Sequence, residues 1–320
     1  MTGLGFLPRG LVPVSLHQLA IGLSDTIAFG VNADGSVVLG QSSSASGFEA
    51  FRWTSDGGMP GLSFLTGGSF SQANAVNADG SVVVGLSSIG GSFASQAFRW
   101  VKDAGLESGV MTDLGFLTGV ASSAALGVNA DGSVVIGWSD YVNGSSSGAQ
   151  AFRWVKSANS ATAGVMAGLG FLTGGFNSTA NAVNADGSVV VGHSDSTSGF
   201  QAFRWTEVGG MQTVSQWLTN GGGSVPSGWT LDSATGVNAD GTVVVGNGTH
   251  NSATEAWLAR SGALVSLADL SASLRTGSYV PQSSSTMAET LRVETPWTYI
   301  SAMASLRACS ERRPFSRALG

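Results

Sequence analysis

Val-Asn-Ala-Asp-Gly-Ser-Val-Val-Val-Gly, at residues 183–192, is the stretch that decides the fold. Asp-Gly favours a tight hairpin turn, because glycine supplies the positive φ that such a turn needs. The valine run after it is typical of a strand that is covered on both faces. The pentapeptide Val-Asn-Ala-Asp-Gly occurs five times, at intervals of 45, 52, 55 and 54 residues, starting at Val31, Val76, Val128, Val183 and Val237.

Two further motifs recur with the same period. Ala-Phe-Arg-Trp follows the first four pentapeptides, starting at Ala50, Ala97, Ala151 and Ala202, and its fifth copy degenerates to Ala256-Trp257-Leu258. Leu-Gly-Phe-Leu, or Leu-Ser-Phe-Leu in the first copy, closes the units, starting at Leu62, Leu114 and Leu169. A period of about 50 residues is typical of propellers and other repeat arrays, so the chain is predicted to be a repeat protein.

One unit contains four predicted strands. In the fourth unit they cover residues 178–184, 188–192, 200–205 and 211–218. Four short antiparallel strands with glycine turns and one tryptophan per unit predict a blade of a β-propeller, so we expect an all-β, kelch-like propeller with about five recognisable repeats. A β-solenoid is the alternative, although its coils are usually shorter. Sustained helical periodicity is not found.

The repeats divide the chain into three parts. Residues 25–270 form the predicted five-repeat domain, closed by a strand at residues 263–267. Residues 1–24 are atypical, and Leu4-Gly-Phe-Leu matches a closing strand whose own unit is missing. Residues 271–320 differ in composition, contain the single cysteine, Cys309, and are predicted to be poorly ordered.

Composition excludes several classes of protein. Residues 1–274 contain 8 Lys and Arg against 17 Asp and Glu, and residues 275–320 contain 6 Arg against 3 Glu, which together give the net charge of −6. An acidic body argues against nucleic acid as a partner, since binding to the phosphate backbone needs clustered basic residues. No stretch is apolar enough for a membrane-spanning helix, and residues 1–24 do not read as an export signal.

The three motifs together closely resemble the bacterial extracellular HAF-type repeat, which is common in passenger regions of outer-membrane autotransporters. The resemblance covers residues 28–267. It implies a location outside the cell or on its outer membrane, and it supplies no catalytic residues. The chain lacks the C-terminal translocator of that family, so the resemblance implies a passenger fragment, with a frameshift before the arginine-rich tail as one explanation.

The motifs do not predict a metal or cofactor site. Each Asn-Ala-Asp-Gly offers one carboxylate, whereas a calcium loop of the EF-hand type needs several. The three histidines, His17, His193 and His250, share no metal-binding spacing. No nucleophile elbow or phosphate-binding loop is found. We expect no cofactor.

The residues that recur in every unit are predicted to hold the repeat together. We expect the arginines to pair with turn aspartates and to pack on aromatic rings. An alternative is a ring of arginines that captures an anionic ligand. The tryptophans are expected in the core between blades. These residues are Asp34, Asp79, Asp131, Asp186, Asp240, Arg52, Arg99, Arg153, Arg204, Trp53, Trp100, Trp154 and Trp205.

The variable loops are the predicted binding region, since loops on a rigid scaffold commonly carry recognition. They span residues 41–48, 86–95, 139–148, 193–199 and 221–231. Candidate sugar-stacking aromatics in or beside them are Phe48, Phe93, Trp138, Tyr141, Phe200 and Trp229. The predicted function is adhesion to a host or environmental glycan or protein, without catalysis. The alternatives are a propeller-type glycan-acting enzyme and a non-functional fragment of a disrupted gene.

Overall fold

The computed structural model describes residues 25–266, apart from residues 91–93, 118–121, 144–145, 161 and 262. The chain divides into a unit Met1–Asp269 and a unit Leu270–Gly320, and every described residue belongs to the first. Two predictions therefore lie outside the described residues. They are the orphan closing segment at residues 4–7 and the poorly ordered tail at residues 271–320.

The described residues form five antiparallel sheets, in each of which the strands follow one another in chain order. The first has three strands, β1(Thr26–Val31), β2(Val37–Ser44) and β3(Gly47–Thr54). The other sheets have four strands each. The second contains β4(Ser71–Val76), β5(Val82–Ser88), β6(Ser95–Lys102) and β7(Gly109–Asp113), and the third contains β8(Ser123–Val128), β9(Val134–Asn143), β10(Ser146–Lys156) and β11(Gly164–Gly168). The fourth contains β12(Ser178–Val183), β13(Val189–Ser194), β14(Gln201–Thr206) and β15(Gly210–Thr213), and the fifth contains β16(Trp229–Val237), β17(Val243–His250), β18(Ala253–Arg260) and β19(Ala263–Ser266).

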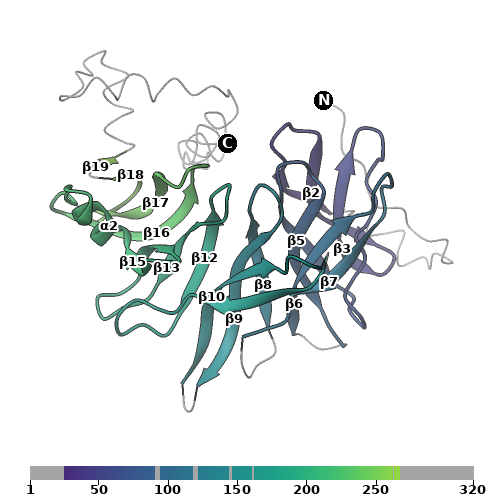
Figure 1. Cartoon of the computed structure of the whole chain (residues 1–320), viewed down its shortest axis with the longest axis horizontal. Helices are drawn as coiled ribbons and strands as arrows, with labels where there is room; N and C mark the ends of the chain where they lie inside the picture. Colours follow the sequence, from purple (N-terminus) through teal and green to yellow (C-terminus); the bar gives the residue numbers. More distant parts are fainter. Residues whose placement is uncertain are drawn as a thin grey trace, which may run out of the picture. The chain divides into compact units, whose positions relative to one another are not determined.

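This arrangement confirms the predicted all-β propeller blades. Each sheet is a four-stranded meander or its three-stranded variant, and its first two strands pack against the first strand of the next sheet (Figure 1). The solenoid alternative is wrong, because a solenoid would pair strands of successive repeats, and among the described residues all the strand pairing is within one repeat. In the first sheet, bridges from Phe51 to Gly61 and from Thr54 to Gly58 stand in place of an outer strand.

The core lies between the sheets in four apolar clusters, one for each pair of neighbours, and a smaller fifth cluster of Phe51 and Met59 lies within the first sheet. Val83, Phe98 and Trp100 of the second sheet pack on Leu39 and Ala50 of the first. The valine run has no polar alternation because both of its faces are covered: Val83 contacts the preceding sheet, whereas Val82 and Val84 contact the following one.

One predicted strand is partly wrong. Residues 211–218 were expected to form a strand, but β15 ends at Thr213 and the helix α2(Val214–Asn220) follows. The Thr213 hydroxyl accepts from the Gln216 amide, and the Gln216 side chain accepts from the Thr213 amide, which is a capping box. Val214 and Leu218 are four residues apart, so the helix buries both in the cluster against the fifth sheet.

The Leu-Gly-Phe-Leu motif does not form the closing strand. It follows the outer strands β7 and β11 as irregular chain, and Gly115 and Gly170 have φ values of +77° and +80°. Its leucines turn inward and fill the gap between one sheet and the next. The motif is therefore a connector, and we call it the Leu-x-Phe-Leu connector below.

Candidate functional site

The two ends of each sheet are built differently. The Asn-Ala-Asp-Gly turn joins the first two strands, so all five of these turns lie at one end of their sheets, the turn end. The loops between second and third strands, and the segments that leave the fourth strands, lie at the opposite end, the loop end, because successive strands are antiparallel.

At the turn end, the repeated side chains bind their own backbone. In the third sheet, Asn129 is 2% exposed and its Oδ1 accepts from the Val134 amide at 2.8 Å. Asp131 Oδ1 accepts from the amide and the hydroxyl of Ser133 at 2.9 and 2.6 Å. The Ser133 hydroxyl bond, with a smaller contribution from its amide, holds the pKa of Asp131 below its ordinary value. Gly132 has a φ of +74°, as the turn requires.

Backbone hydrogen bonds join these turns across the sheets. The Ala78 amide donates to the Ala130 carbonyl, Ala130 donates to Ala185, and Ala185 donates to Ala239, each at 3.1 Å. Successive turns are thus held at a fixed spacing, and their polar groups bind one another.

The repeated arginines reach from one sheet to the turn of the next. Arg99 is 3% exposed, its Nε donates to the Gly132 carbonyl at 3.1 Å, and its guanidinium lies 5.8 Å from the centre of the Trp154 ring. Burial lowers its pKa. Equivalent bonds reach the turn glycines of the other sheets from Arg52, Arg153 and Arg204. These hydrogen bonds run to the glycine carbonyl beside each turn aspartate. The charge of Asp131 partly offsets the lowering of the Arg99 pKa, and Arg52 forms an ion pair with Glu107 at 2.8 Å. The expected packing on aromatic rings is found for Arg99, Arg153 and Arg204.

The repeated tryptophans lie between the sheets. Trp100 and Trp154 are each 2% exposed within the clusters, and Trp205 packs against the cluster of the third and fourth sheets. Trp53 of the first sheet is half-buried. The turn end and the repeated residues therefore serve the scaffold, and their polar groups are largely engaged with it.

At the loop end, the predicted aromatics occupy separate places. Phe48 and Phe200 are exposed, and Trp138 is half-buried. Tyr141 is 9% exposed, and its hydroxyl donates to the Phe176 carbonyl at 3.0 Å. Trp229 stacks on His250, with ring centres 4.6 Å apart. The prediction for Phe93 falls outside the described residues.

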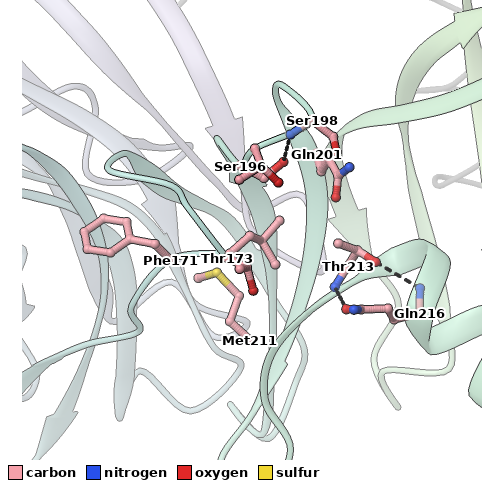
Figure 2. A pocket seen from close by; sticks show the side chains of 10 residues that line it. Phe171, Thr173, Ser196, Ser198, Gln201, Met211, Thr213 and Gln216 are labelled. Carbon is pink, nitrogen blue, oxygen red and sulfur yellow. Dashed lines mark hydrogen bonds between the residues drawn. The ribbon is translucent and has the colours of Figure 1, made fainter.

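A pocket of about 220 Å³ opens at the loop end, where the connector of the third sheet meets the fourth sheet (Figure 2). The Thr197 amide donates to the Thr173 carbonyl at 3.2 Å and ties the two loops together. The first turn of α2 forms the opposite wall. The lining residues are Phe171, Leu172, Thr173, Ser196, Thr197, Ser198, Gln201, Met211, Thr213 and Gln216.

The lining of this pocket is polar and uncharged. Hydroxyl and amide side chains supply donors and acceptors, and Figure 2 shows Met211 among them and Phe171 to one side. The Ser196 hydroxyl accepts from the Ser198 amide at 3.0 Å, which shapes the loop. The Gln201 side chain has no hydrogen bond within the described part of the chain, so its amide is free to bind a ligand. In that same part, no group of three or more His, Cys, Asp and Glu side chains could hold a metal ion.

The predicted loop at residues 193–199 contributes Ser196, Thr197 and Ser198, but the sequence analysis did not predict the rest of the pocket. Phe171 and Leu172 belong to the repeated Leu-Gly-Phe-Leu motif, for which a structural role was predicted. Thr213 and Gln216 come from α2, and the Thr-x-x-Gln spacing of a capping box was the available signal. None of the five predicted aromatics that the structure describes lines the pocket.

Buried serines at the loop end were also missed. The hydroxyls of Ser87, Ser139 and Ser194 accept from the last leucine amide of the Leu-x-Phe-Leu connector that precedes each sheet, at 3.0, 3.0 and 3.1 Å. All three are fully buried. Each of these serines fixes a connector.

A scan against protein-family models and a search of curated proteins found no match. In the described residues, no helix is long and apolar enough to cross a membrane.

Among solved structures, the chain is similar to a protein described as TolB from Agrobacterium tumefaciens, with 12% identity, a TM-score of 0.47, and coverage of 74% of this chain and 78% of that one. It is also similar to prolyl oligopeptidase B from Galerina marginata, with 10% identity, a TM-score of 0.48, and coverage of 76% of this chain and 34% of that one. The chain thus spans about a third of the peptidase. These likenesses say nothing about activity, and the fold assignment rests on the strand order and packing described above.

Proposed function

We propose that the protein is a binding module that takes an uncharged, hydroxyl-rich ligand, a glycan, in the pocket at the loop end of the fourth sheet. The observation that carries this proposal is the lining, in which none of the ten residues is charged and seven bear a hydroxyl or an amide. Sugars bind through such groups, with apolar side chains against their C–H faces.

The scaffold supports binding at this end. The turn end uses its amides, carboxylates and guanidinium groups in bonds between sheets, so few of its polar groups remain for a partner. The loops differ from sheet to sheet, and they rest on connectors that are fixed by buried serines. Variable loops on a rigid support are a common arrangement for recognition.

The cellular setting is part of the proposal. The repeats resemble extracellular passenger repeats, and the chain has only 11% charged residues, with serine and glycine in the loops. A glycan-binding module in that setting would act in adhesion at the cell surface.

The test is a glycan array, followed by calorimetric titration of the best ligand with the wild-type chain and with Gln201→Ala. Loss of one or two hydrogen bonds predicts about two- to tenfold weaker binding. Gln150→Ala is the matched control, since Gln150 holds the same position in the third sheet and does not line the pocket. Equal binding by both variants would remove the pocket from the proposal, and turnover of the glycan would favour the enzyme alternative.

A further inference from the structure

The first sheet leaves exposed part of the face that every other sheet buries against its predecessor. Phe51 on this face is fully buried and packs with Met59, whereas Val38 and Trp53 are only partly buried. The first-strand alanine on this face is 0% exposed in the second to fifth sheets, at Ala73, Ala125, Ala180 and Ala234, but Ala28 is exposed. Val31 on the same strand is 58% exposed, whereas its equivalent in the second sheet, Val76, packs against the first sheet. An exposed apolar face of this kind marks a contact surface.

In the second, third and fourth sheets, a Leu-x-Phe-Leu connector covers part of this face. Leu62 and Leu65 pack on Val83, Phe98 and Trp100. Leu114 and Leu117 occupy the same place on the third sheet, and Leu169 and Leu172 occupy it on the fourth.

Two hydroxyls hold the backbone of each connector. Before the fourth sheet, the Leu172 amide donates to Ser194 Oγ at 3.1 Å, and Ser178 Oγ donates to the Gly170 carbonyl at 2.8 Å. Ser178 and Ser194 are paired across β12 and β13. The second and third sheets repeat both bonds with Ser71 and Ser87, and with Ser123 and Ser139.

Among the second to fifth sheets, the hydroxyl pair occurs only where a connector precedes the sheet. The fifth sheet follows α2 instead of a connector, and Leu231 and Gly248 occupy the two positions. The first sheet keeps the pair as Thr26 and Ser42, whose oxygens lie 2.8 Å apart. It therefore carries the hydrogen-bonding groups for a connector.

We propose that residues 4–7, Leu-Gly-Phe-Leu, dock on the exposed face of the first sheet as its connector. The backbone of residues 4–7 then binds the Thr26 and Ser42 hydroxyls, and Leu4 and Leu7 cover Ala28, Val38 and Trp53. Eighteen residues separate Leu7 from Thr26, which is ample length for the chain to return to β1.

A second copy of the chain fits this face less well. Between neighbouring sheets, an arginine of one sheet donates to the turn glycine carbonyl of the next. The fifth sheet has Leu258 at the arginine position, so its free face cannot make that bond to Gly35 of another copy.

The test is hydrogen–deuterium exchange of the full chain with Leu4→Ser/Leu7→Ser. We expect β1 and β2 amides to exchange about tenfold faster, because burial of two leucines is lost, while β13 amides are unchanged. Leu16→Ser/Leu19→Ser is the matched control, since it removes two leucines from residues 1–24 outside the motif copy. Ser42→Gly, which copies the fifth sheet, should act in the same direction as the first variant.

Two results would overturn the proposal. One is equal exchange of β1 in the Leu4/Leu7 variant and its control. The other is protection of β1 that rises with protein concentration alongside a dimer in light scattering, which would assign the face to a second copy.

Discussion

The turn end and the loop end of the sheets differ in what their polar groups do. At the turn end, the same residues recur and bind the next sheet, as in the bond from Arg99 to the Gly132 carbonyl. At the loop end, residues differ between sheets, and one pocket retains an amide, that of Gln201, which does not bind the scaffold in the described residues. The comparison teaches that repetition here stabilises contacts between sheets, whereas variation lies in the exposed loop residues, beside the buried serines that fix the connectors.

The largest expected effect is on the core between sheets. Phe152 is 0% exposed between the second and third sheets, and Phe152→Ala should lower the free energy of unfolding by about 3–5 kcal/mol. Phe200→Ala is the control at the loop end, where the side chain is 59% exposed, and it should change stability by less than about 0.5 kcal/mol. Urea denaturation measures both, and similar losses would break the comparison.

A smaller effect is expected from the arginine bonds. Arg99→Leu copies the residue that the fifth sheet carries and should cost about 1–3 kcal/mol, because the Gly132 carbonyl loses a buried donor. Arg204→Leu should cost less, since its bond to the Gly241 carbonyl is 3.3 Å long and its buried Nε has no partner in the described residues. The reverse order in urea denaturation would contradict this account.

The turn aspartates predict a dependence on pH. Hydrogen bonds from the hydroxyl and amide of Ser81 hold the pKa of Asp79 below its ordinary value of 3.8, and Ser133 acts likewise on Asp131. A depressed folded pKa means that the stabilisation is complete above the unfolded pKa and is lost as the pH falls through the folded value. Stability should therefore be steady down to about pH 4 and should fall below it.

The matched variant for this prediction is Asp79→Asn/Asp131→Asn. Thermal unfolding followed between pH 2.5 and pH 6 should show a shallower acid-side loss in the variant than in the wild-type chain, since two of the titrating groups are gone. Parallel curves would assign the acid sensitivity to other carboxylates.

The smallest effect on stability is expected at the pocket. Ser198 is exposed and its side chain makes no hydrogen bond in the described residues, so Ser198→Ala should leave the free energy of unfolding within about 0.5 kcal/mol of wild type. Its effect should appear only in ligand binding. A clear loss of stability would show that the exposed loop residues also serve the scaffold.

Much of the fold could be predicted because local sequence and tertiary packing agree. The Asp-Gly pair predicts the turn, and the valine run predicts a strand that is buried on both faces. The helix α2 was not predicted because the apolar residues of 211–218 lie close enough together to suggest a strand, while the burial of the helix depends on the fifth sheet. The hydrogen-bond acceptor of each arginine could not be predicted, because the turn aspartate and the turn glycine are adjacent in sequence. Only the three-dimensional structure shows whether the arginine reaches the aspartate carboxylate or the glycine carbonyl.

The candidate site was harder to predict than the fold. Its walls come from a connector, a loop and the start of a helix, which belong to two different sheets. Side chains such as Thr173 and Gln201 meet only because successive sheets pack face to face. Aromatic residues suggested a ligand surface, but Tyr141 uses its hydroxyl within the protein and Trp229 stacks on His250.

The chain of hydrogen bonds from Ala78 to Ala239 has a consequence for cooperativity. The second to fifth sheets are coupled in chain order through the same contact, so this part of the array behaves as a line of linked units whose unfolding depends on every link. A weakened link in the middle, between the second and third sheets, divides that line into two blocks that melt at separate temperatures. A weakened link beside the fifth sheet releases a single unit and leaves one main transition. The number and size of the calorimetric peaks therefore show which link a substitution has weakened.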